Sequence, residues 1–121
     1  MPNTCWNYIT IVCKNVEHKD EIKNIHDNEL CKEAGNEGLL KIQEKGAQGI
    51  RVLYETGWNP DFDWMESLVE KYKNCWFKDE WHEEGGGAGV WIGYHERNEK
   101  IIEQFSWDDL SLEEKHYLFV E

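Results

Sequence analysis

Runs of apolar and alternating side chains divide this chain into strands separated by turn residues. The segment from Trp6 to Cys13 is rich in β-branched and aromatic residues and poor in charge, which predicts a central strand. Residues 48–54 show the two-residue period of a half-buried strand. The glycines at 85–87 predict a hairpin turn between two later strands. In chain order the predicted strands are 6–13, 39–43, 48–54, 75–84, 88–97 and 101–105, with Gly46 at the turn between the second and third.

Two segments carry apolar residues at helical spacing. The first covers residues 17 to about 32, where isoleucine and leucine recur among charged side chains. The second follows Asn59, which we expect to cap it, and Pro60, which suits the first helical position. The apolar face of this second helix consists of Trp64, Met65, Leu68, Val69 and Tyr72.

The order of these elements indicates the fold. Strand, helix, strand, strand, helix and strand, followed by added strands, predicts an antiparallel sheet with two helices packed on one face. This is a ferredoxin-like two-layer α+β sandwich with a C-terminal hairpin or strand extension. A length of 121 residues suits a single domain over 1–121.

Three short motifs carry a resemblance to a known family. They are the opening Met1–Asn7, the helix start at 57–60 (Gly-Trp-Asn-Pro), and the glycine-rich stretch 84–89. Together they resemble the YubB-type ferredoxin-like domain family, small proteins of phages, plasmids and some large viruses whose function is unassigned. The chain departs from the family pattern at Thr4 and at Asp61, which stands where a second proline is common. The resemblance implies a viral or mobile-element origin and supplies no catalytic residues.

Charge narrows the range of partners. The chain has 25 acidic and 13 basic residues, a net charge of −12. Such a chain repels phosphate backbones, so we expect no direct binding of nucleic acid. The charge permits a basic partner or imitation of a nucleic-acid surface, but an acidic solvated exterior that keeps the protein soluble is the favoured explanation.

The cellular location is predicted from what the chain lacks. It has no apolar run of the roughly 18 residues needed to span a bilayer, and its first residues do not resemble a signal peptide. We therefore expect a soluble intracellular protein that does not bind membranes, and the resemblance to viral and mobile-element proteins implies the host-cell cytoplasm. Its cysteines are scattered, and in an intracellular chain we expect reduced thiols that act as small apolar side chains. They are Cys5, Cys13, Cys31 and Cys75.

A metal site is the first chemistry to consider. A hairpin that turns near Gly86 pairs His82 close to Val90, which leaves His95 on the order of 16 Å away at roughly 3.3 Å per residue. These two side chains therefore cannot share one ion, and we expect no metal. The residues considered were His82, Glu83, Glu84, His95 and Glu96.

No motif assembles a reaction centre. The glycines at 85–89 are preceded by two glutamates and followed by a strand, so they favour a hairpin over a phosphate-binding loop. Cys13 and Cys75 lie within predicted strands, where side chains are usually packed. We expect a non-enzymatic protein without a cofactor.

One feature indicates a binding surface. A two-layer fold covers only one face of its sheet, and alternation places part of a set of aromatic and charged residues on the other face. Aromatic side chains there favour burial against a second protein or a second copy of the chain. Alternatively, the tail from Trp107 to Val120, with a capping box at Ser111 and Glu114, covers this face and completes the core. The set comprises Tyr8, Arg51, Trp76, Lys78, Trp91 and His95.

Two functions follow as hypotheses. The first is an interaction protein of a phage, virus or mobile element that binds a host or viral protein, or itself as a homodimer, through the sheet face or the acidic surface. The second is a protein that binds a small molecule, for example one that sequesters a signalling nucleotide to counter host defence. It would use stacked tryptophan rings and the cations Arg51, Arg97 and Lys78.

Overall fold

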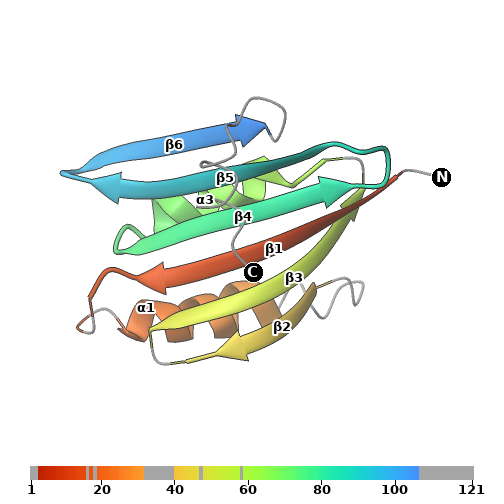
Figure 1. Ribbon diagram of the computed structural model, residues 1–121. Coiled ribbons are helices and arrows are strands. Elements are labelled where there is room, and N and C mark those ends of the chain that lie inside the picture. Colours follow the sequence, from red (N-terminus) through yellow and green to blue (C-terminus); the bar gives the residue numbers. More distant parts are fainter. Residues whose placement is uncertain are drawn as a thin grey trace.

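The computed structural model describes residues 3–15, 17, 19–31, 40–46, 48–57 and 59–106. Within these ranges six strands, two α-helices and one π-helical segment follow one another (Figure 1). Their bounds are β1 Thr4–Cys13, α1 Lys19–Asn24, η2 Ile25–Leu30, β2 Leu40–Lys45, β3 Gly49–Gly57, α3 Phe62–Lys71, β4 Cys75–Glu83, β5 Ala88–Glu96 and β6 Glu99–Ser106.

The six strands form one antiparallel sheet in the order β2-β3-β1-β4-β5-β6. The first four strands and the helices between them have the strand order and connections of a ferredoxin-like fold. Strands β5 and β6 extend this sheet beyond β4. In Figure 1, α1 and α3 both lie behind the sheet, and its other face is turned to the viewer. The predicted α+β sandwich with added C-terminal strands is confirmed.

The core lies between the helices and one face of the sheet. Along β1 every second side chain is buried, and Ile9, Ile11 and Cys13 are at most 5% exposed. Ile9 pairs with Val52 of β3, and Ile11 pairs with Ile50. Burial of a branched apolar side chain contributes about 1.5–3 kcal/mol, so this central row accounts for much of the sheet's attachment to the helices.

The first helical segment differs from a regular α-helix. It begins at Lys19 and becomes π-helical from Ile25 to Leu30. The side chains of Ile22, Ile25 and Leu30 are all buried. Leu30 lies five positions after Ile25, more than one α-helical turn, and the wider π turn keeps both on the buried side. The predicted end of this helix near residue 32 lies outside the described residues.

The second helix begins two residues later than predicted. Asp61, rather than Asn59, is the N-cap, and its carboxylate accepts the backbone N–H of Trp64 at 3.1 Å. Pro60 therefore lies before the helix. The carbonyl of Asn59 accepts the hydroxyl of Thr56 at 2.7 Å, so residue 59 still belongs to the turn after β3. A carboxylate also interacts favourably with the positive end of the helix, which explains why Asp61 caps it.

Helix α3 also contacts the edge strand β6 through an ion pair. Its apolar residues Met65, Leu68 and Val69 are buried, while Glu70 on its exposed side accepts a hydrogen bond from Lys100 of β6 at 2.7 Å.

No helix within the described ranges is both long and apolar enough to span a bilayer. The predicted cap at 111–114 and the predicted packing of 107–120 lie outside the described residues.

Candidate functional site

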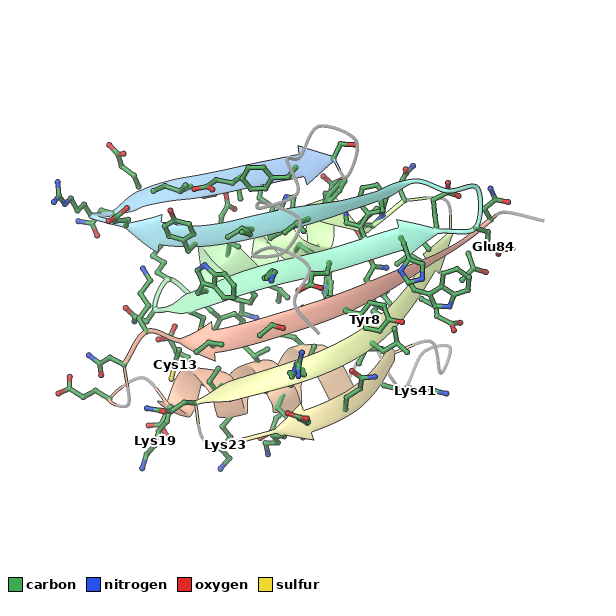
Figure 2. The ribbon with its side chains drawn as sticks, in the orientation of Figure 1. Tyr8, Cys13, Lys19, Lys23, Lys41 and Glu84 are labelled. Carbon is green, nitrogen blue, oxygen red and sulfur yellow. The ribbon has the colours of Figure 1, made fainter. Side chains whose placement is uncertain are left out.

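Alternation along β1 directs half of its side chains away from the helices. Tyr8 and Val12 on this side are 42% and 37% exposed, and Figure 2 shows Tyr8 on the face turned to the viewer. The strand pairings extend this surface onto β3, β4 and β5. We name it the open face, made up of Trp6, Tyr8, Thr10, Val12, Arg51, Leu53, Glu55, Trp76, Lys78, Glu80, His82, Val90, Ile92 and Tyr94. Val90 on this side is only 1% exposed, and the exposed part of the open face lies over β1, β3 and the His82 end of β4.

Three rings on the open face contact one another. His82 of β4 pairs with Trp6 of β1, and their ring centroids are 5.0 Å apart. The Tyr8 ring lies 5.8 Å from the His82 ring at an interplanar angle of 17°, a stacked arrangement. We name these residues the ring cluster. Because Tyr8 remains exposed, the cluster presents an aromatic surface to solvent.

Two cations lie beside the ring cluster. Arg51 of β3 and Lys78 of β4 both pair with Thr10 of β1, one from each side. The ammonium of Lys78 is 2.7 Å from the carboxylate of Glu80, and both side chains are largely buried. Lys78 is thus neutralised locally, which leaves Arg51 as the more available of the two cations.

Four of the predicted residues share the open face. Tyr8, Arg51, Trp76 and Lys78 lie there as the sequence indicated, and Trp76 is half-buried opposite Val12. Trp6 and His82 were not predicted as binding residues. The position of Trp6, two residues before Tyr8 in one strand, was the signal that places both on one face.

Trp91 is on the opposite face and belongs to the core. It is 1% exposed, pairs with Asp79 of β4, and its ring stacks on Phe62 of α3 with centroids 6.4 Å apart. A β-carbon placed on Gly93 would lie 2.5 Å from the Trp91 ring. Glycine at 93 therefore makes room for the indole beneath the helix, and this removes Trp91 from the binding set.

His95 is on the helix side as well. It is 9% exposed, and its Nδ1 has no hydrogen-bond partner within the described structure. Its carbonyl accepts a bond from the ammonium of Lys14. The side chain of His95 is therefore not available to a ligand on the open face.

Arg97 lies in the tight turn between β5 and β6. It has φ 51° and Asn98 has φ 67°, the left-handed pair that a two-residue hairpin turn requires. Because the turn is at the end of the sheet, Arg97 does not join Arg51 and Lys78 in one cluster.

The glycine-rich hairpin binds a carboxylate of its own chain. The Glu83 side chain accepts the backbone N–H groups of Gly85 at 2.9 Å and Gly87 at 3.0 Å, and the amide of Asn3 at 3.2 Å. These hydrogen bonds lower the pKa of Glu83, and the bond from Gly85 makes the largest contribution. The amide groups that a phosphate would need are thus occupied, and the hairpin interpretation is confirmed.

The two histidines considered for a metal lie on opposite faces of the sheet. His82 pairs with Ala88 rather than near Val90, because the hairpin is centred one residue earlier than predicted. His82 is on the open face and His95 on the helix face. No group of three metal-binding side chains occurs among the described residues.

A buried carboxyl lies under the sheet. Asp79 of β4 is 1% exposed, and its Oδ1 has no hydrogen-bond partner in the described part of the chain. Burial, with a smaller contribution from Glu80, raises the pKa of Asp79 to about 8. Asn7 of β1, also 1% exposed, donates from its amide to the carbonyl of Tyr54 at 2.9 Å and the hydroxyl of Thr56 at 3.0 Å.

The strand thiols are not activated nucleophiles. Burial raises the pKa of Cys5 to about 11 and that of Cys75 to about 12. A thiol with such a pKa is almost entirely protonated at neutral pH, so these two side chains pack as apolar groups. Cys13 is also buried, whereas Cys31 is exposed.

Comparison with known proteins identifies a fold family. A family model described as a ferredoxin-like domain in Api92-like protein matches residues 39–118. No curated protein matches the chain. Among solved structures, the crystal structure of the guanylyl cyclase Cya2 is similar at 11% identity and a TM-score of 0.35, over 98% of this chain and 70% of that one. A likeness of that degree indicates nothing about reaction or ligand.

Proposed function

The chain belongs to the family of ferredoxin-like domains in Api92-like proteins, and from this fold we propose that it is a non-enzymatic protein-binding domain that acts through its open face. The observation that carries the proposal is the ring cluster, in which Tyr8 stacks on His82 and is still 42% exposed. Exposed tyrosine and tryptophan beside polar residues are typical of the centre of protein interfaces.

The charge favours a basic partner over a second copy. The whole chain carries −12, so two copies repel each other, whereas a basic protein is attracted. On the open face, Lys78 is paired with Glu80, and Glu55 lies across from Trp6. We propose a partner that presents apolar groups for the rings and basic groups for the surrounding carboxylates.

The proposal extends to origin and location. The opening Met1–Asn7 and the glycine-rich hairpin resemble the YubB-type domains of phages, plasmids and large viruses. We infer an accessory protein of such an element that binds a host or viral protein in the host cytoplasm. Expression from the native element, followed by cell fractionation, tests the location.

The ring cluster is tested by photo-crosslinking. Tyr8 is replaced by p-benzoylphenylalanine, and the same residue replaces Asp63, an exposed position of α3 on the helix side. We expect position 8 to crosslink one specific basic protein that position 63 does not capture. Equal crosslinking from both positions would contradict the proposal.

Light scattering on the same protein separates the two kinds of partner. A monomer at all concentrations agrees with a different protein as partner. A dimer that Tyr8→Ala converts to a monomer would instead assign the open face to a second copy.

A small anionic ligand is the second candidate. A hollow of about 390 Å³ lies beside the open face, and the charged residues among those that line it are Glu44, Lys45 and Arg51. Its size is in the range of small-molecule sites. A thermal-shift screen with cyclic mono- and dinucleotides tests it, because a ligand that binds only the folded state raises the melting temperature. We expect Arg51→Ala to abolish any such shift, and a shift unaffected by Arg51→Ala would exclude this hollow.

A further inference from the structure

Two cysteines face each other across β1 and β4. Cys13 is the last residue of β1, Cys75 is the first residue of β4, and the two are direct partners in the antiparallel register. Both are free thiols on the helix side of the sheet, and Cys13 is labelled at the end of its strand in Figure 2.

The backbone hydrogen bonds next to Cys13 and Cys75 show which kind of antiparallel pair they form. The N–H of Lys14 donates to the carbonyl of Asn74 at 2.9 Å, whereas the N–H of Cys13 points to the other side and donates to Gln48 at 2.8 Å. Cys13 and Cys75 are therefore a non-hydrogen-bonded pair, in which the Cα atoms are about 4.5 Å apart and the side chains are close. Disulfides span Cα separations of roughly 4.4–6.8 Å.

The pairing also brings the two thiols into each other's electrostatic environment. The pKa of Cys75 is raised first by burial and then by the charges of Glu21 and Cys13. By contrast, Cys5, which lies in β1 with Cys13, pairs with Thr56 of β3 and Glu83 of β4 and has no thiol opposite it.

We propose that Cys13 and Cys75 form a reversible oxidation site that closes into an intramolecular disulfide between β1 and β4. With oxidised glutathione as the oxidant, one cysteine thiolate attacks a glutathione sulfur and releases one glutathione. The second cysteine then attacks the mixed disulfide and releases the other glutathione. Two thiols lose two protons and two electrons, and the oxidant is reduced to two glutathione molecules.

The location of the pair determines how the reaction starts. Cys13 is 5% exposed and Cys75 is fully buried, so the oxidant reaches them when the strand ends open next to the exposed residues Lys14 and Asn74. The reaction is therefore slow in the folded protein and accelerates as the pH rises, because only the thiolate attacks.

Peptide mapping tests the proposal. The folded protein is incubated with oxidised glutathione, alkylated, and digested for mass spectrometry. We expect a mass loss of about 2 Da and one linked peptide that contains both Cys13 and Cys75. We also expect the melting temperature to rise by roughly 10 °C, since the bond closes a loop of roughly 60 residues.

Variants and alternative links complete the test. Cys75→Ala should abolish the mass loss and the temperature shift, while the matched Cys5→Ala variant should retain both. Should Cys75→Ala fail to fold, Cys13→Ala or the map of the unchanged protein decides the question. Links through the exposed Cys31, or alkylation of both Cys13 and Cys75 after prolonged oxidation, would overturn the proposal.

Discussion

At the residue scale, Asp79 couples stability to pH. Its carboxyl has a pKa of about 8 in the folded protein because of burial, against roughly 3.9 in an unfolded chain. Between these two values the folded state holds a proton that unfolding releases. The free energy of unfolding contributed by this group therefore falls as the pH rises through that range.

Replacement of Asp79 should remove this dependence. We expect the unfolding free energy of the unchanged protein to fall by up to about 1.4 kcal/mol per pH unit between pH 5 and 7.5. Asp79→Asn should flatten the curve, because asparagine does not titrate. Urea unfolding across this range measures it, with the exposed Asp63→Asn as the control. Parallel curves for Asp79→Asn and the unchanged protein would contradict the assignment.

At the element scale, the β4–β5 hairpin depends on one carboxylate. Glu83 holds the amide groups of Gly85 and Gly87, and its pKa is lowered in the folded state. The stabilisation is therefore present above the unfolded pKa and is lost as the pH falls through the folded one.

Glu83→Gln should loosen this hairpin. We expect faster hydrogen exchange at the amides of Gly85 and Gly87 in this variant. At low pH, where Glu83 of the unchanged protein is protonated, the two proteins should exchange these amides at similar rates. Exchange measured by NMR checks this, with Glu55→Gln on β3 as the control. Unchanged protection of both glycine amides would show that the carboxylate is dispensable.

The path of β5 over the helix depends on Gly93. A β-carbon there would lie 2.5 Å from the Trp91 ring and 2.8 Å from Val69. Gly93→Ala should therefore lower the free energy of unfolding by about 1–3 kcal/mol through overpacking. Gly46→Ala is the control, since its nearest neighbour is 3.8 Å away. Denaturant unfolding of both variants gives the comparison, and equal losses would be inconsistent with a steric cause.

The strands could be predicted from local pattern, because alternation and turn glycines are local signals. The sides of the sheet could be predicted only in part. Residues that pair across the β4–β5 hairpin are both even-numbered or both odd-numbered, so Trp76 and Trp91 cannot share a face. Both faces carry a tryptophan, however, and sequence pattern alone does not show which one the helices cover. The cap at Asp61 was missed because Asn59 and Pro60 give an equally good local signal.

At the scale of the whole molecule, the exposed rings favour binding of nucleic acid, whereas the net charge opposes it. An exposed ring cluster on the sheet of a ferredoxin-like fold would suit stacking of nucleic-acid bases. Affinity for nucleic acid also requires cations that neutralise phosphates, and here Lys78 is already paired with Glu80 in a chain of net charge −12.

We therefore expect no binding of single-stranded DNA or RNA at physiological salt. Fluorescence anisotropy of labelled oligonucleotides at about 50 and 200 mM salt tests this, because phosphate-driven binding weakens steeply between those concentrations. Binding at low salt that disappears at high salt and in Tyr8→Ala would show that the rings stack bases despite the charge. Absence of binding at both concentrations would agree with a protein as the partner of the ring cluster. The carboxylates around the aromatic residues attract a basic protein, whereas they repel the phosphates of a nucleic acid.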